Sequence, residues 1–96
     1  MPKSNFTNDY TIFREMLKKL RLERGITQSA LSDALGMAQS FVSKYEMGER
    51  RLDFVEVKRL CDELGKPLQE FADEFNKATR DVRKAAANKS KGGRKK

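Results

Sequence analysis

The 96-residue chain contains no histidine and a single cysteine, Cys61. Without histidine it lacks the side chain that most often acts as an acid, a base or a metal ligand near neutral pH, and one thiol cannot form an internal disulfide. No cluster of cysteines or carboxylates has metal-ligand spacing, and no glycine-rich phosphate loop is present. Adjacent acids such as Asp62 and Glu63 would point in different directions on a helix. These absences argue against an enzyme and predict no metal and no cofactor.

Long apolar runs are missing as well. No secretory hydrophobic region follows the first residues, and no stretch approaches the length that spans a membrane. Cys61 falls within an apolar stripe, where a buried core thiol is favoured over a redox sensor or a metal ligand. We therefore expect a soluble protein of the reducing cytoplasm with no membrane partner.

What the chain does contain is an apolar residue at every third or fourth position, which predicts helices. No strong alternation of a strand interrupts them, so the expected fold class is all-α. The first helix would begin at a cap on Asn8 or Asp9 and end near Gly25. A later helix would run from a cap at Asp53 to Gly65. The apolar stripes of these two helices comprise Tyr10, Phe13, Leu17, Leu20, Val57, Leu60, Cys61 and Leu64.

The segment from Thr27 to Gly48 is the most informative part of the sequence. Thr27 can cap a short helix, and Gly36 can end that helix in the left-handed conformation that a Cβ disfavours. A second short helix over 38–47 would follow the turn and end at Gly48. The expected inward residues are Leu31, Ala34 and Leu35 in the first of these helices and Ala38, Val42 and Tyr45 in the second.

The other side of the second helix would display the polar side chains of Gln39, Ser40, Ser43 and Lys44. A glutamine amide can bond two adjacent atoms of a base edge, and a serine hydroxyl both donates and accepts. A lysine ammonium can reach a guanine acceptor or a phosphate. Two short helices joined by a tight turn, with a polar face directed outward, are the arrangement that reads the major groove of DNA.

Several motifs recur here in a fixed order. LKKLR and RGITQ surround residues 20–28, LSDALG ends at Gly36, QSFVSKYE covers 39–46, and GERRL follows. With these motifs, the segment from Leu17 to Phe71 resembles the phage-repressor and Cro type of helix-turn-helix domain, also called the XRE type. The resemblance implies a five-helix, lambda-repressor-like domain that binds double-stranded operator DNA, usually as a homodimer.

The resemblance also implies roles for individual residues. Gln28, at the start of the second helix, would bond a phosphate. Gln39 and Ser40 match the base-reading pair at the start of the recognition helix, and Lys44 stands at another base-reading position one turn later. Ser43 lies between them and would face a phosphate or a base edge.

Other matched positions have structural roles. Arg21 and Glu46 match a pair that forms a buried salt bridge, and breaking such a pair costs about 3–5 kcal/mol. Met47 stands where a polar residue is common, so one backbone contact of the family would be missing. Phe41 is bulkier than the small polar residue usual at its position, and it would contact a thymine methyl group or cover the edge of the core.

Charge is distributed unevenly within the net charge of +7. Residues 1–52 carry nine Lys or Arg against six acids, residues 53–75 carry three against seven, and residues 76–96 carry nine against one. Lys18 belongs to the basic first part and is a candidate phosphate contact. Arg50 and Arg51 follow the recognition helix, where phosphate contact is favoured over an ordinary exposed turn. Arg51 could instead pair with Asp53.

We expect three segments: an N-terminal arm over 1–8, a helix-turn-helix domain over 9–75, and a helical extension with a basic tail over 76–96. The last helix would begin near Pro67 and run to about Ala87 before the Gly92 and Gly93 pair. The tail from Asn88 should be disordered in isolation. It would serve as a solvated tail or, as the favoured alternative, as an arm on DNA phosphates.

The leading hypothesis is therefore a sequence-specific DNA-binding transcriptional regulator that acts as a repressor. An antitoxin or a restriction-system controller would share the fold. A protein-interaction module that keeps the helix-turn-helix as a scaffold, with a protein partner, is the third possibility. For the dimer interface the candidates are Phe71, Phe75 and Val82, although closing the monomer core is the favoured role of Phe71.

Overall fold

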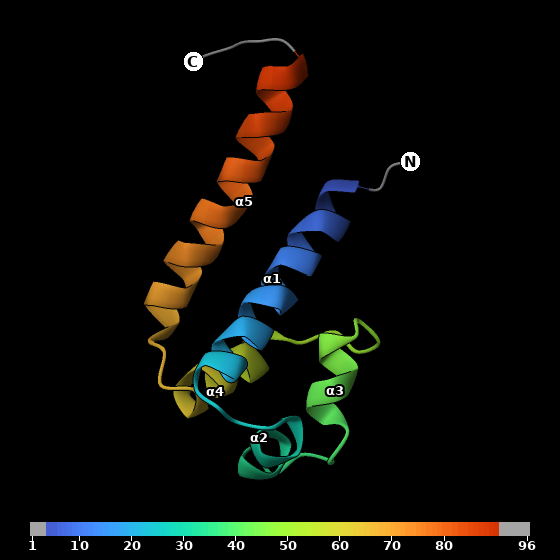
Figure 1. The fold of residues 1–96 in the computed structure, drawn as a ribbon, viewed down its shortest axis with the longest axis vertical. Helices are drawn as coiled ribbons and strands as arrows, with labels where there is room; N and C mark the ends of the chain where they lie inside the picture. The colour runs from blue at the N-terminus through green and yellow to red at the C-terminus, as the bar shows by residue number, and fades with distance from the viewer. Residues whose placement is uncertain (1–3, 91–96) are drawn as a thin grey trace.

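A computed structural model describes the backbone of residues 4–90 and the side chains of residues 8–81. Within that range helices are the only regular secondary structure (Figure 1). The helices are α1 (Ser4–Glu23), α2 (Gln28–Ala34), α3 (Phe41–Glu46), α4 (Phe54–Glu63) and α5 (Leu68–Ser90). The expected all-α, five-helix domain is confirmed for the described residues. None of these helices is long and apolar enough to cross a membrane.

The helix ends follow local chemistry. The Thr27 hydroxyl accepts the Ala30 N–H at 3.0 Å at the start of α2, as expected of a cap. Asp53 and Glu56 form a reciprocal capping box at the start of α4. Gly36 has φ +70°, which allows α2 to end in a sharp turn toward α3. The helix-turn-helix arrangement is therefore set largely by local sequence.

The start of α1 differs from the expectation. The helix begins at Ser4, so residues 4–8 of the expected N-terminal arm are helical, and neither Asn8 nor Asp9 is the cap. No proline or glycine occurs between Ser4 and Glu23. Asn and Asp inside a helix cost only about 0.7 kcal/mol each. Nothing between Ser4 and Asp9 therefore prevents the helix from beginning at Ser4.

The core joins one face of every helix. Leu17, Leu31, Val42, Tyr45, Leu60 and Cys61 are each completely buried. Burial raises the pKa of the Cys61 thiol, as expected of a core cysteine. Two expectations for the inward faces were wrong, because Ala34 and Ala38 are exposed and Ser32 and Phe41 are buried in their place. Ala38 lies before the start of α3, and the larger apolar side chain of Phe41 is buried in the first turn of that helix. Ser32 is held inside by a hydrogen bond described below.

The far end of the core is closed by aromatic rings. Phe13 lies 6.2 Å from Phe71 and 6.1 Å from Phe75 between ring centroids, with both pairs edge to face. Phe71 is buried and Phe75 is half-buried. Both rings therefore help to close the monomer, which removes Phe71 from the candidates for a dimer interface.

The helix α5 continues without a break across the boundary expected at residue 75 and ends at Ser90, beyond Asn88. The N-terminal end of α1 and the C-terminal end of α5 both point away from α2 and α3 (Figure 1). The expected disordered tail falls mostly on residues 91–96, which lie outside the described residues. So does the side chain of Val82.

Tyr45 presents an unusual feature: its side chain is fully buried, yet its hydroxyl has no partner among the described residues. Burial is also the main cause that raises the pKa of this phenol. An unsatisfied buried polar group costs about 1–3 kcal/mol. We therefore expect Tyr45→Phe to raise the free energy of unfolding by about 1 kcal/mol or more, measured by urea unfolding.

The same substitution elsewhere supplies the control. The Tyr10 hydroxyl accepts the Leu52 N–H at 3.1 Å, so Tyr10→Phe should lower the stability by about 1 kcal/mol. A loss of stability in Tyr45→Phe would mean that the Tyr45 hydroxyl is hydrogen-bonded, for example to an internal water.

Candidate nucleic-acid interface

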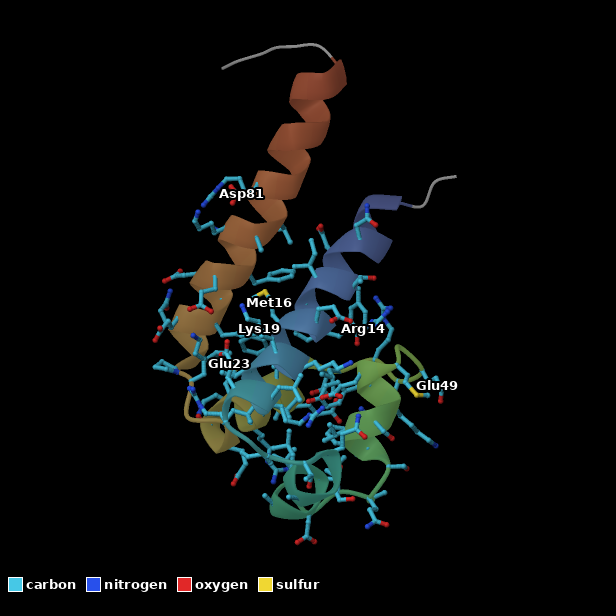
Figure 2. The ribbon with its side chains drawn as sticks, in the orientation of Figure 1. Arg14, Met16, Lys19, Glu23, Glu49 and Asp81 are labelled. Carbon is cyan, nitrogen blue, oxygen red and sulfur yellow. The ribbon has the colours of Figure 1, made fainter. Side chains whose placement is uncertain are left out.

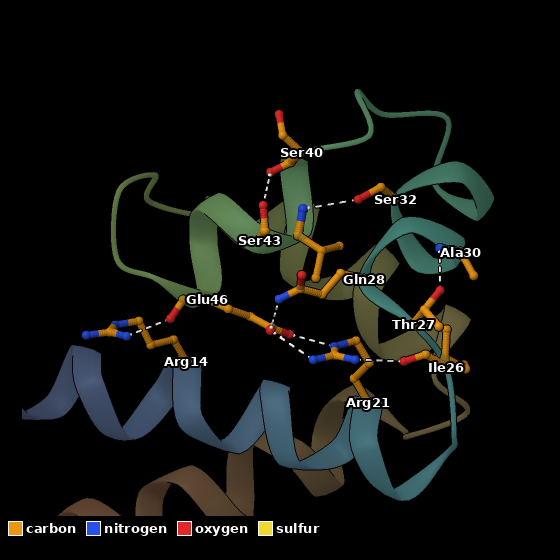
Figure 3. A network of polar contacts seen from close by, with 11 residues as sticks. Arg14, Arg21, Ile26, Thr27, Gln28, Ala30, Ser32, Ser40, Ser43 and Glu46 are labelled. Atoms are coloured by element: carbon orange, nitrogen blue, oxygen red, sulfur yellow. Dashed lines mark hydrogen bonds and ion pairs between the residues drawn. The ribbon is translucent and has the colours of Figure 1, made fainter.

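The polar row expected on the recognition helix lies at the surface of the molecule. Gln39, Ser40 and Lys44 are exposed and Ser43 is half-buried. The α-helix is shorter than the expected 38–47, because Gln39 and Ser40 lie in a turn in which the Phe41 N–H bonds the Ala38 carbonyl at 2.9 Å. The Ser43 hydroxyl donates to the Ser40 carbonyl at 3.1 Å, so it supports this turn (Figure 3).

Behind this row, α3 is fixed to α2 by a serine that sequence reasoning did not select. The Ser32 hydroxyl oxygen accepts the Val42 N–H at 3.1 Å in a buried position (Figure 3). This bond satisfies one of the amides at the start of α3 that have no partner within the helix. The sequence signal that could have indicated a buried Ser32 was its position next to Leu31, on the inward face of α2.

Arg21 and Glu46 are brought together as expected. The Arg21 Nε and Nη2 atoms donate to the two carboxylate oxygens of Glu46 at 2.7 and 3.0 Å, and Nη1 donates to the Ile26 carbonyl at 2.8 Å. Both side chains are less than 10% exposed. The hydrogen bonds to Glu46 raise the pKa of Arg21. This bidentate pair ties α1 to the last turn of α3.

Gln28 belongs to the same network. Its amide nitrogen donates to Oε1 of Glu46 at 2.8 Å, so one of its two N–H groups is used within the protein (Figure 3). The second N–H is the group that a phosphate contact would require. The bond also links the start of α2 to the end of α3.

The two arginines of the following loop have different environments. Arg50 forms a bidentate ion pair with Glu56 at 2.9 and 3.1 Å and lies 4.8 Å from the centre of the Phe41 ring. This hydrogen bonding lowers the pKa of Glu56. Arg51 does not pair with Asp53 but lies 4.1 Å from the centre of the Tyr10 ring. Stacking leaves the N–H edge of Arg51 open, so it is better placed than Arg50 to donate to a phosphate.

The burial of Phe41 decides between its two predicted roles, a contact to a thymine methyl group and a cover for the edge of the core. Its side chain is 4% exposed and packs edge to face on Tyr45, with ring centroids 5.5 Å apart. It therefore covers the edge of the core and supports Arg50, and it is not available to a thymine methyl group. Met47 is 61% exposed at the end of α3. Lys18 is exposed on α1, as a phosphate contact requires.

Among residues 8–81, no group of three His, Cys, Asp or Glu side chains is arranged to hold a metal ion. The site consists instead of an exposed amide, hydroxyls and an ammonium on a small rigid support. Such groups can donate to base edges and phosphates but supply no nucleophile activated by a neighbouring base.

Comparisons with known proteins agree with this geometry. A family model described as Helix-turn-helix matches residues 17–71. The SPbeta prophage-derived uncharacterized HTH-type transcriptional regulator YonR of Bacillus subtilis (strain 168) is 35% identical over 54 residues. That alignment covers 56% of this chain and 50% of the relative, so the chain spans half the length of the protein it matches. Because the family model covers more than half of the chain, the chain belongs to the XRE-type helix-turn-helix family.

Proposed function

We propose that this protein is a sequence-specific DNA-binding transcriptional regulator that inserts α3 and the turn before it into the major groove. The observation that carries the proposal is the exposed row of Gln39, Ser40 and Lys44 on a support held by buried polar bonds. A rigid support matters because base reading depends on hydrogen bonds of defined direction. The family membership and the name of the Bacillus relative support the same function.

We further propose that the protein binds as a homodimer and represses transcription by occupying an operator. One recognition helix contacts few base pairs, whereas two helices related by a two-fold axis read half-sites about 34 Å apart. Selection of bound duplexes from a random-sequence library tests the dimer and the base reading, and transcription from a promoter that carries the selected site tests repression. Two inverted half-sites are the expected result, and enrichment of a single half-site would contradict the dimer. Failure to enrich any sequence would contradict base reading.

The role of Gln39 can be tested on the selected duplex. Gln39→Ala should weaken binding to that duplex by about 1–3 kcal/mol and leave binding to a random duplex nearly unchanged, because the lost bonds go to a base edge. Gln69→Ala, which changes an exposed glutamine on α5, is the matched control. Fluorescence anisotropy titrations at one fixed salt concentration measure both. An equal loss of affinity for the two duplexes would mean that Gln39 contacts the DNA backbone and not a base edge.

A further inference from the structure

The part of α1 that precedes residue 17, where the family match begins, contacts α3 and the loop that follows it. We propose that Tyr10 and Arg14 are positioning residues that fix the direction of α3 and the place of Arg51 for DNA reading. The proposal rests on the proposed function in one respect: the effect on DNA recognition requires that α3 reads DNA. The contacts themselves can be tested without DNA.

Arg14 holds the end of α3. Its Nη1 atom donates to the backbone carbonyl of Glu46 at 2.7 Å (Figure 3). The last carbonyls of a helix have no partner within it, and a cation there also interacts favourably with the helix dipole. Because α3 has only six residues, it depends strongly on such outside contacts. Figure 2 shows Arg14 on the side of α1 that faces α3, whereas Lys19 lies on the other side, toward α5.

Gly48 allows the chain to pass directly against this guanidinium. Its φ is +83°, and a Cβ at this position would lie 3.3 Å from Cζ and Nη2 of Arg14. A side chain would therefore be strained in its backbone and would also crowd Arg14. The close approach indicates that the Arg14 contact and the turn after α3 form one packed unit.

Tyr10 holds the other end of the same segment. Its hydroxyl accepts the Leu52 N–H at 3.1 Å, and its ring centre lies 5.2 Å from that of Phe13 and 4.1 Å from the Arg51 guanidinium. Tyr10 and Arg14 are four residues apart, so they project from one face of α1. One face of α1 therefore contacts the segment 46–52 at both of its ends.

This arrangement predicts a defect in recognition. Arg14 is half-buried and its bond is to protein backbone, so its loss should tilt or loosen α3 without removing a phosphate contact. Binding to a specific duplex depends on the direction of the base-reading side chains, whereas binding to a random duplex depends mainly on the number of phosphates neutralised. Loss of Arg14 should therefore lower the ratio of specific to non-specific affinity.

The first experiment compares Arg14→Ala, Arg14→Lys and Lys19→Ala in the full chain, using the selected duplex and a random duplex of equal length. Lys19→Ala is the control, because it removes the same charge from the opposite face of α1. We expect Arg14→Ala to lose roughly tenfold in affinity for the selected duplex and less than about twofold for the random one. Arg14→Lys should recover part of the loss, and Lys19→Ala should behave as the wild type.

An unchanged ratio of the two affinities in Arg14→Ala would overturn the DNA part of the proposal. If both affinities fall equally and the salt slope is reduced by about 0.9 per subunit, Arg14 is a phosphate contact. Urea unfolding of each variant establishes that the folded protein is the species being titrated.

The second experiment needs no DNA. Amide hydrogen exchange of the free protein should show the Leu52 amide protected in the wild type and exchanging at least about tenfold faster in Tyr10→Phe, because its acceptor is gone. Amides within α4, such as that of Leu60, should keep their rates. An unchanged Leu52 rate would overturn the role of Tyr10. If the library yields no duplex, the proposed function fails, and this exchange result still decides whether α1 holds the segment.

Discussion

Replacing Glu46 with alanine is expected to lower the free energy of unfolding by about 3–5 kcal/mol. The substitution leaves Arg21 buried with its bidentate partner removed, and it also removes the acceptor of the Gln28 amide. An uncompensated buried charge costs more than the ion pair gains. The bond from Arg14 is to the Glu46 backbone and survives the change, so α1 would hold α3 at one point instead of two. Urea unfolding followed by circular dichroism measures the loss.

Two further variants separate burial from charge. The double variant Arg21→Met with Glu46→Leu removes both charges and should recover most of the stability lost in Glu46→Ala, because apolar replacements of a buried pair are often close to neutral. Asp62→Ala breaks the exposed pair with Lys58, whose side chains are 51% and 59% exposed, and should cost less than about 1 kcal/mol. A loss below about 1 kcal/mol in Glu46→Ala would show that the pair does not stabilise the fold.

The predictable part of the fold is the part governed by local chemistry. Thr27, Gly36 and Asp53 act where the sequence indicates, because caps and left-handed turns depend on a few neighbouring residues. The start of α1 was missed because Asn and Asp can cap a helix or lie within one at little cost. The local sequence alone does not distinguish these cases.

The buried face of α3 and of the turn before it shows a second limit of prediction from sequence. Helical spacing alone predicted that Ala38 is buried and did not decide whether Phe41 is buried. In the structure Ala38 is exposed and Phe41 is buried. Ala38 lies outside the six-residue helix α3, so helical spacing does not apply to it. The rotation of that helix about its axis depends on which large side chain finds a partner, and here Phe41 packs on Tyr45. A short helix offers too few positions for its period to fix the buried face.

The candidate site could be predicted in its residue types but not in its internal bonds. Arg50 and Gln28 carry the right groups for phosphate contact, yet both use donors within the protein, on Glu56 and Glu46. Those partners come from other helices, so no local pattern indicates them. The contacts of Tyr10 and Arg14 could not be predicted for the same reason, since the residues they bind lie 42 and 32 positions further along the chain.

This division of the cations leads to a prediction about salt. Three cations are predicted to contact phosphates: Lys18, Arg50 and Arg51. Arg50 is engaged in an ion pair with Glu56, whereas Lys18 and Arg51 are exposed and pair with no acid among the described residues. A dimer using both from each subunit would show a slope of about −3.6 for the logarithm of affinity against the logarithm of salt concentration, at about 0.9 per phosphate. Affinity for the selected duplex should then fall roughly 150-fold between about 50 and 200 mM salt.

Substitutions identify which charges set this slope. Arg51→Ala or Lys18→Ala should each reduce its magnitude by about 1.8 in a dimer, because each removes two phosphate contacts. Arg50→Ala should leave the slope unchanged and lower stability instead, since Glu56 loses its ion-pair partner. A slope that Arg51→Ala does not change would remove Arg51 from the interface. A slope much steeper than about −5.4, the value that Lys18, Arg50 and Arg51 together would give, requires further cations on the duplex. Residues 76–96 carry nine cations that could supply them. The direction of α5, away from α2 and α3, favours the shallower value (Figure 1).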